Sequence, residues 1–495
     1  MAHFLPLGVV VLATASLISG CQAPMPTPPT AMLDGLPAQF QSLQQTDPEK
    51  RQNLQSLDTI ALAERLGRWW EVFNDPVLNE LVSLAISANW DLQTALQRIE
   101  IASAKVTKAK SLGLPLVYGQ ATANRENYGT TNLADGLGTL DTFGFSASVS
   151  WETDVFGSIA SRAQAAQFDL EAAQADRQAI MVSIVADVVA TYGQLRAMQE
   201  GLALKQRYVA LAADQVKLQK DLLITGQVPA ADVVKMQRDY SQAMSSIPPM
   251  QASVDVLIST CAILTGGYPR ALDDLLKKPG PLLLASLPLP DTLPSQLLKQ
   301  RPDIVNQEKV LLASLSDVDA ARADFMPQFS IPLSIGYNTS PFSLLLNPAS
   351  FVWTLGASMI APIYTGGMLE ANLRIAKATK VEDQQKYEKI VRQALKEVED
   401  AVLEYQGSTS ELSLLENVKT EQMVIVSQQQ TLFKTGIESL SQVNDAEMKL
   451  VQFREAIVKA RYTQVLSLTT LYKSMGGGWI EPNTTVSQPE RVAKN

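Results

Sequence analysis

The sequence predicts a mixed α/β membrane protein in which strand hairpins alternate with very long helices, built as two copies of one unit. Three observations predict this fold class. Turn residues recur at a constant offset of 210 residues, as in Thr225-Gly226 and Thr435-Gly436. Paired segments that alternate large apolar with small or polar residues precede each of two long stretches. These stretches run for roughly 68 residues with almost no Gly or Pro, far longer than an ordinary globular helix.

The composition narrows the function classes. The 495-residue chain is 46% hydrophobic and 18% charged, so it can bury a core, and its net charge of −9 argues against nucleic-acid binding. The single histidine, His3, lies in the predicted leader. The mature chain therefore lacks the imidazole of serine and cysteine nucleophile sites and of common zinc sites. We expect no enzyme activity, no metal site and no cofactor beyond a covalent lipid, and we expect Cys261 to be a buried small apolar residue.

The N-terminus is predicted to be a lipoprotein signal peptide over residues 1–20, followed by a lipidated, extended tether over 21–68. An apolar stretch of signal-peptide length ends in Leu17-Ile18-Ser19-Gly20-Cys21, which resembles a bacterial lipobox. The resemblance implies that Cys21 is lipidated, and Gln22 after it implies sorting to the outer membrane. A chance cysteine after an ordinary signal is the alternative. The first three residues contain no Lys or Arg, which departs from the usual signal-peptide pattern.

Each repeat begins with a helix that stops before a proline, over about 75–112 and about 294–324. Two segments of alternating character follow, as a strand needs when one face meets lipid and the other a lumen. Repeat 1 is assigned to 69–280, repeat 2 to 281–478 and a C-terminal tail to 479–495. The four predicted strands lie at about 115–125, 143–155, 328–338 and 351–363.

A long helix follows the second strand of each repeat, after Gly157 and Gly367. At about 1.5 Å per residue, such a helix reaches about 100 Å, and its apolar spacing favours coiled-coil packing. A second helix is predicted after each break, over about 230–264 and about 440–475. No stretch after Cys21 has about 18 consecutive uncharged apolar residues, so we expect the chain to cross the membrane by strands.

Four strands cannot close a barrel by themselves, and an open sheet edge in lipid leaves unpaired backbone groups that cost several kcal/mol each. The chains must therefore associate. Three subunits would supply about twelve strands, enough for a hollow barrel. The same symmetry would arrange twelve helices as a second hollow barrel.

The residues resemble the TolC-like outer membrane efflux protein family, and in particular its lipid-anchored branch. The motifs that carry the resemblance are Trp69-Trp70-x-x-Phe73-x-Asp75-Pro76-x-Leu78, Trp151-Glu152-x-Asp154-x-Phe156-Gly157, Arg301-Pro302-Asp303-Ile304, Ala361-Pro362-Ile363-Tyr364-x-Gly366-Gly367 and Thr435-Gly436 with Asp445-Ala446. The resemblance implies a homotrimeric, 12-stranded outer-membrane channel continuous with a periplasmic α-barrel. It implies as partners outer-membrane lipid, a periplasmic adaptor and an inner-membrane pump, which we expect to be of the resistance-nodulation-division type.

The resemblance also implies a periplasmic gate at the two helix breaks, where carboxylates ring the lumen. By motif, Asp445 occupies an acidic gate position and Asp232 the corresponding place in repeat 1. The alternative is that both acids merely favour a helix N-terminus. Family members with a second gating Asp would place it at Gln442, and those with a gating Arg at Glu438, so this chain departs from both patterns.

Local chemistry at the breaks gives two further expectations. Gly226 and Gly436 are expected to end their helices in the left-handed conformation, and the resemblance implies that both turns contact the adaptor. Ser439 and Gln442 have the spacing of a capping box, which is an alternative to a gate role for Gln442.

We therefore predict the exit duct of a tripartite efflux system, which conducts drugs or other small solutes passively to the exterior. The exit channel of a type I protein-secretion system is an alternative within the class. A periplasmic coiled-coil scaffold without a pore is the alternative from a different class, and the paired strand segments argue against it.

Overall fold

The computed structural model describes residues 66–127, 139–284 and 301–478. These residues form two compact units, and each predicted repeat contributes to both. The sheet unit takes its described residues from Gln97–Gln174 and Asn306–Lys389. The helical unit takes them from Gly35–Leu96, Ala175–Val305 and Ile390–Asn495. Cys21 and the predicted leader, tether and tail fall outside the described residues, apart from a few residues where the tether meets repeat 1.

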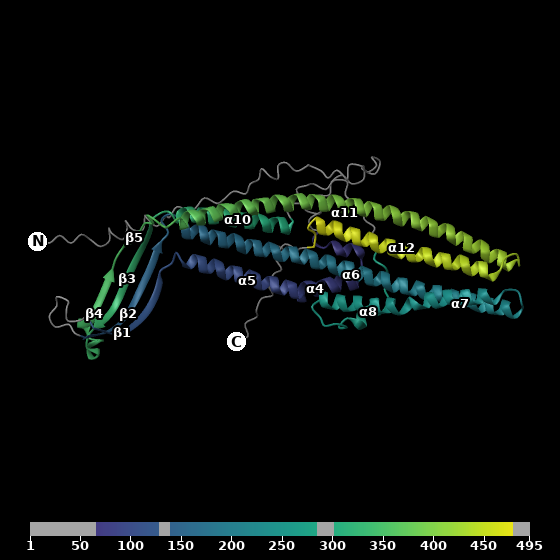
Figure 1. The fold of residues 1–495 in the computed structure, drawn as a ribbon, viewed down its shortest axis with the longest axis horizontal. Coiled ribbons are helices and arrows are strands. Elements are labelled where there is room, and N and C mark those ends of the chain that lie inside the picture. Colours follow the sequence, from purple (N-terminus) through teal and green to yellow (C-terminus); the bar gives the residue numbers. More distant parts are fainter. Residues whose placement is uncertain (1–65, 128–138, 285–300, 479–495) are drawn as a thin grey trace, which may run out of the picture. The chain divides into compact units, whose positions relative to one another are not determined.

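The sheet is antiparallel and runs in the order β1-β2-β3-β4, with a short β5 that also pairs with β3 (Figure 1). Its strands are β1 (Leu116–Asn127), β2 (Thr139–Thr153), β3 (Gln328–Thr339), β4 (Phe351–Leu355) and β5 (Ser358–Ile360). Two short 3-10 helices, η5 (Phe342–Leu344) and η6 (Pro348–Ser350), lie between β3 and β4. Each hairpin comes from one repeat, and the pairing of β2 with β3 joins the two repeats in one sheet.

The last predicted strand is interrupted. The sequence predicts one strand over about 351–363, whereas the structure has β4 and β5 separated by Gly356 and Ala357. Both pieces keep the same register with β3, as shown by the pairs Leu333↔Leu355 and Ser330↔Ser358. The gap faces Pro332, which has no N–H to donate, although its carbonyl still accepts from the Gly356 N–H at 3.0 Å.

The register gives the sheet two chemically different faces. Side chains alternate between faces along each strand, so cross-strand partners share a face. One cross-strand row joins Ala121, Phe145, Tyr337 and Phe351, and the next joins Gly119, Ala147, Ile335 and Trp353. A third row joins Val117, Val149, Leu333 and Leu355. We call the face of these three rows the apolar face.

The opposite face, which we call the polar face, carries mainly small and polar side chains. Its rows join Tyr118, Ser148, Ser334 and Thr354, and then Gln120, Ser146, Gly336 and Val352. Such a division is required of a membrane strand with lipid on one side and water on the other.

The two long helices have equal length and the same place in their repeats. α6 spans Ser158–Ile224 and α11 spans Met368–Lys434, each of 67 residues. The remaining helices are η3 (Trp69–Phe73), α4 (Pro76–Ala88), α5 (Trp90–Ser111), α7 (Ala230–Ser245), α8 (Ile247–Leu264), α9 (Asp273–Leu276), α10 (Pro302–Ala323) and α12 (Leu440–Ser474). Helices α5, α6, α10 and α11 contribute residues to both units.

Two helices predicted as continuous are divided. The helix predicted over about 75–112 ends at Ala88 and restarts at Trp90, because the Asn89 side chain accepts the Asp91 N–H at 2.8 Å and donates to the Leu264 carbonyl at 2.8 Å. The helix predicted over about 230–264 divides at Ser246. There Pro248 and Pro249, which lack N–H groups, fall in the first turn of α8.

In the sheet unit, α6 is joined by ion pairs and a small apolar cluster to α10 and to Asp324, which follows it. Arg162 Nη2 lies 2.6 Å from Asp324 Oδ2, and Lys309 Nζ lies 2.7 Å from Glu171 Oε2. The cluster consists of Ala165, Phe168, Leu312 and Ala313. These contacts fix the first part of the long helix beside the helix that leads into β3.

The core of the helical unit is built around the Trp69-Trp70 motif. Trp69 stacks on Tyr472 with ring centroids 5.0 Å apart, and the core includes Leu78 and Leu81 of α4. The Tyr192 hydroxyl donates to Asp75 Oδ2 at 2.8 Å, while Asp75 Oδ1 caps the first turn of α4. Cys261 is buried in this core, as expected from the sequence.

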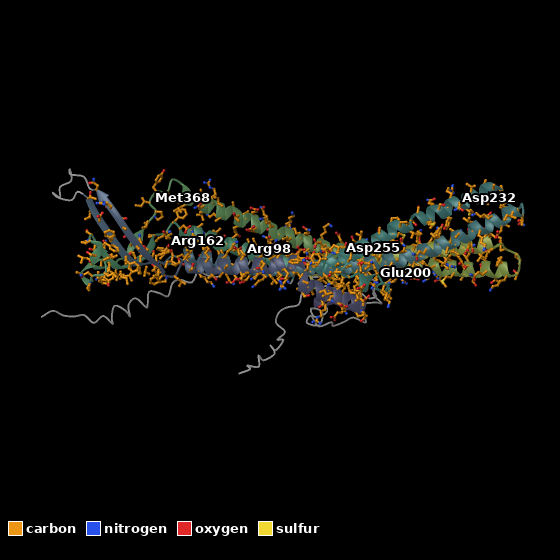
Figure 2. The ribbon with its side chains drawn as sticks, turned by 90° about the horizontal axis from the view of Figure 1, so that it is seen from below. Arg98, Arg162, Glu200, Asp232, Asp255 and Met368 are labelled. Atoms are coloured by element: carbon orange, nitrogen blue, oxygen red, sulfur yellow. The ribbon has the colours of Figure 1, made fainter. Side chains whose placement is uncertain are left out.

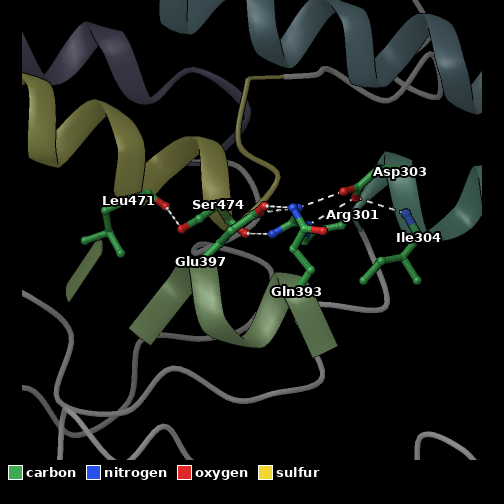
Figure 3. A network of polar contacts seen from close by, with 7 residues as sticks. All are labelled: Arg301, Asp303, Ile304, Gln393, Glu397, Leu471 and Ser474. Atoms are coloured by element: carbon green, nitrogen blue, oxygen red, sulfur yellow. Dashed lines mark hydrogen bonds and ion pairs between the residues drawn. The ribbon is translucent and has the colours of Figure 1, made fainter. Parts of the chain in front are cut away.

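Arg301 fastens the start of α10 to two other helices of the helical unit (Figure 3). Its guanidinium donates to Asp303 at 2.7 Å, to Glu397 of α11 at 2.8 Å and to the Ser474 carbonyl of α12 at 2.7 Å. Burial disfavours the charged form, but the bonds to Asp303 and Glu397 outweigh it and raise the pKa of Arg301. The motif Arg301-Pro302-Asp303-Ile304 thus has a structural task at the start of α10.

Among the described residues, two helical segments contain a window long and apolar enough to cross a membrane by length and composition: α6 and the segment Ala230–Leu264. The search for an uninterrupted run of uncharged apolar residues in the sequence finds neither segment. In α6, 56% of this window is buried, and a helix in the core of a soluble protein would meet the same criterion.

Candidate functional site

The two helix breaks have the same backbone geometry. Gly226 has φ +71° and Gly436 has φ +76°, so the predicted left-handed conformation is confirmed. At the first turn the Gln227 N–H donates to the Leu222 carbonyl at 2.9 Å, and at the second the Ile437 N–H donates to the Leu432 carbonyl at 2.9 Å. These bonds are those of the Schellman motif, which ends a helix and reverses the chain. Each long helix thus returns as a hairpin, α6 with α7 and α11 with α12 (Figure 1).

The candidate gate acids differ in their local roles. Asp232 is exposed in the first turn of α7, where an acid favours the helix N-terminus, and Figure 2 shows it near the turn. Asp445 lies beyond the first turn of α12, which contains no acid, so first-turn stabilisation does not explain it. The helix-terminus alternative therefore fits Asp232 and is wrong for Asp445. The two acids lie on different hairpins, and the gate role of each stays a prediction.

Ser439 caps α12. Its hydroxyl accepts the Gln442 N–H at 3.4 Å, which is one half of the predicted capping box. Gln442 is exposed, and Glu438 is half-buried in the turn, where its N–H donates to the Leu432 carbonyl at 3.3 Å. The gate roles of Gln442 and Glu438 and the adaptor contacts of Gly226 and Gly436 also stay predictions.

One residue that the sequence analysis missed holds Asp445. Gln215 of α6 is only 3% exposed, and its Nε2 donates to Asp445 Oδ1 at 2.9 Å and to the Ser441 carbonyl at 3.0 Å. No sequence signal marks Gln215, because the contact joins residues 230 positions apart. The contact connects the long helix of repeat 1 with the second helix of repeat 2.

Ion pairs join the same helices farther from the turns. Arg207 of α6 lies 2.9 Å from Glu447 of α12, and Lys205 of α6 lies 3.3 Å from Glu455 of α12. On α11, bonds from Lys419 and Arg461 lower the pKa of Glu416. In the described part of the chain, no group of three or more His, Cys, Asp or Glu side chains could hold a metal ion.

Comparison with known proteins identifies the relatives of this chain. The family model described as outer membrane efflux protein matches residues 81–256 and 293–477, one segment in each repeat. The cation efflux system protein CusC of Escherichia coli O6:H1 is 26% identical over 418 residues, covering 83% of this chain and 88% of CusC. The solvent efflux pump outer membrane protein SrpC of Pseudomonas putida is 27% identical over 424 residues, covering 85% and 90%.

A solved structure of the outer-membrane channel OprN superposes with a TM-score of 0.81 at 26% identity, covering 93% of this chain and 99% of OprN. The predicted fold class is therefore confirmed. The relatives are efflux components and channels rather than enzymes. Because the family model covers most of both repeats, this chain belongs to the outer membrane efflux protein family.

Proposed function

We propose that this protein is the outer-membrane exit duct of a tripartite efflux system, through which small solutes pass passively to the exterior. The observation that carries the proposal is the sheet. It has an apolar face and a polar face, and among the described residues β1 pairs only with β2, while β4 and β5 pair only with β3. In lipid, such open edges cost several kcal/mol for each unpaired backbone group.

Association of three copies closes the sheet. With β4 and β5 counted as one interrupted strand, three chains supply about twelve strands, and the polar faces line a water-filled lumen. The lipid anchor at Cys21 holds the chain in the outer membrane; SilC of Salmonella typhimurium, 24% identical, is named a probable outer membrane lipoprotein. The partners are a periplasmic adaptor and an inner-membrane pump of the resistance-nodulation-division type.

The substrate is selected by the pump and adaptor rather than by this chain. Relatives of nearly equal similarity are named for cation, solvent and pyoverdine export. A duct with little selectivity of its own serves such different cargo. We assign the gate to the turn end of the helical unit, with Asp445 as its principal acid and Asp232 as a second.

The test uses a matched pair of substitutions at adjacent β3 positions on opposite faces. Ile335→Arg places a charge on the apolar face, where it costs about 2–4 kcal/mol at mid-bilayer, so trimer assembly in the membrane should fail. Ser334→Arg places the same charge on the polar face, so trimers should form and show lower cation selectivity in planar bilayers.

The wild-type trimer should show discrete conductance steps, and a heat-dissociated sample should show none. A well-folded wild-type trimer without conductance would refute the duct. Equal tolerance of Ile335→Arg and Ser334→Arg would refute the assignment of the two faces.

A further inference from the structure

The loop between β3 and β4, residues 340–350, lies at the end of the sheet away from α5 and α6 (Figure 1). Its short helices, η5 and η6, leave large apolar side chains uncovered by the described residues. Phe342 is 67% exposed, Leu344 is 44% exposed and Leu346 is 75% exposed. We call these three residues the loop apolar set. Apolar side chains of this size, gathered on one loop, indicate a contact with an apolar partner.

The loop belongs to a long stretch without charge. Between Asp324 and Glu370 the sequence contains no Asp, Glu, Lys, Arg or His, so β3, the loop, β4 and β5 are all uncharged. The first hairpin ends differently, because Arg125 of β1 lies 3.3 Å from Asp141 of β2. An uncharged loop is suited to an apolar medium, where an unpaired charge is costly.

Much of the loop backbone is bonded within the loop itself. Pro341 and Pro348 have no N–H group to satisfy. The Ser350 hydroxyl donates to the Leu344 carbonyl at 2.9 Å. The backbone N–H groups that donate to acceptors within the loop are those of Leu344, Leu345, Asn347, Ala349 and Ser350. Such bonding lets an irregular segment leave bulk water, because backbone groups without partners are costly there.

A ring contact shows toward which side of the sheet the loop is folded. The ring of Phe342 meets the ring of Phe143 edge to face, with centroids 5.3 Å apart. Phe143 is two residues from Phe145 along β2, so both side chains belong to the apolar face. The loop therefore packs against the apolar face, which the proposed duct turns to lipid, and not against the polar face.

The charged row of the first hairpin shows how deep the loop reaches. Arg125 and Asp141 face each other one row beyond Phe143 on the same face of the sheet. Two residues along a strand span about 7 Å. Segments that lie in a membrane interface reach about 5–10 Å into the boundary between headgroups and acyl chains. With the charged row at the level of the headgroups, Phe342 lies at the depth of such interfacial segments.

We propose that the β3–β4 loop is an interfacial membrane anchor, in which the loop apolar set contacts acyl chains of the outer leaflet beside the barrel. The loop then fixes the depth of the barrel in the membrane and does not cover the mouth of the duct. The inference rests on the proposed function for the presence of the membrane, but the surroundings of the loop can be measured apart from conduction.

Site-directed labelling measures these surroundings in the full-length trimer in phosphatidylcholine vesicles. Leu346→Cys is labelled with bimane, while the native Cys261 is buried and Cys21 is predicted to be acylated. We expect a lipid with a nitroxide near its headgroup to lower the emission about twofold or more, and iodide in the water to lower it little. The matched control is Leu140→Cys, at the same end of the sheet but on the polar face, where iodide should quench and lipid should not. Ile335→Cys, on the apolar face, should be quenched by lipid.

A second measurement separates an anchor from a lid over the mouth. Leu344→Glu with Leu346→Glu sets two charges at the membrane interface, so the proportion of trimer that inserts into vesicles should fall about threefold or more. Channels that do insert should conduct as the wild type does. The matched control, Leu344→Met with Leu346→Met, keeps the loop apolar and should insert normally.

The anchor is overturned if iodide quenches the Leu346→Cys label as strongly as the Leu140→Cys label. It is also overturned if neither quencher reaches the Leu346→Cys label, because a neighbouring copy would then cover the loop. Normal insertion of the double Glu variant with altered conductance would show a lid instead. If the Ile335→Cys label escapes the lipid quencher, the sheet is not in the membrane and the duct fails together with the anchor. Lipid quenching of the Leu346→Cys label in a trimer that never conducts would refute the duct and leave the anchor standing.

Discussion

The hydroxyl of Tyr192 offers a quantitative test of the helical core. Tyr192 is fully buried, Asp75 is 7% exposed, and the hydroxyl donates to Asp75 Oδ2 at 2.8 Å. Burial raises the pKa of Tyr192, so the hydroxyl remains a donor at every working pH. Tyr192→Phe keeps the ring, and with it the packing below Arg196, whose Cζ lies 4.8 Å from the ring centroid. The substitution therefore removes the hydrogen bond to a buried carboxylate, together with the interaction of the hydroxyl with Arg196, and keeps the packing of the ring.

A hydrogen bond to a charged group contributes about 1.5–3 kcal/mol. Asp75 keeps its bonds to the first turn of α4, so the loss should appear as local opening of α4 rather than global unfolding. At about 1.4 kcal/mol per factor of ten, the α4 amides should exchange about 10- to 150-fold faster.

Hydrogen exchange followed by mass spectrometry on the intact trimer measures this change. The control is Tyr387→Phe, which removes a hydroxyl from another buried tyrosine, on α11 in the sheet unit, and should leave α4 unchanged. A change below about threefold in α4 for Tyr192→Phe would refute the reasoning, because it would mean that water or another donor replaces the hydroxyl without cost.

Other predictions concern single groups. Burial raises the pKa of Cys261 to about 12, so maleimide near pH 7.5 should label it only after unfolding, and labelling of the folded trimer would contradict its placement. Cys21→Ser should abolish palmitate incorporation yet leave channel formation intact; residual incorporation would contradict the anchor. Asp445→Ala with Asp232→Ala should raise resting conductance and antibiotic leakage, and unchanged leakage in a well-expressed variant would count against the gate. Hydrogen bonds from Lys419 and Arg461 lower the pKa of Glu416, so the carboxylate stabilises the fold above pH 4.5, and this stabilisation is lost as the pH falls further. Glu416→Gln should therefore make the melting temperature of the trimer depend less on pH in this acidic range. An unchanged pH dependence would contradict the assignment.

The features predicted correctly from the sequence are those that depend on the local backbone preferences of a few residues. Gly226 and Gly436 end their helices because few other residues adopt positive φ, and both stretches with almost no Gly or Pro are helices of 67 residues. Pro248 and Pro249 lack N–H groups and account for the division between α7 and α8, which the predicted single helix over about 230–264 does not contain. The break at Asn89 is harder to predict from the sequence, because the Asn89 side chain is held by the carbonyl of Leu264, which is 175 residues away.

The candidate site was predicted only in part for the same reason. Asp445 was found through a motif, whereas Gln215, which holds it, belongs to the other repeat and has no pattern around it. A glutamine in a helix with many Gln and Ala residues is most often exposed to solvent. Only the packing of α6 against α12 distinguishes Gln215 from its neighbours.

The two Schellman turns carry a consequence for mutational tolerance. Although both glycines have positive φ, no atom of the described residues lies within 4 Å of the position where a Cβ would stand on Gly226 or Gly436. Within the described part of the chain, a side chain there meets only the intrinsic backbone penalty of about 1–2 kcal/mol. A saturation library at either position should therefore return a graded series, with Asn and Asp tolerated best and Val and Ile worst. The hairpin turns are thus places where sequence drift can adjust the ends of the long helices step by step while the rest of the fold is kept.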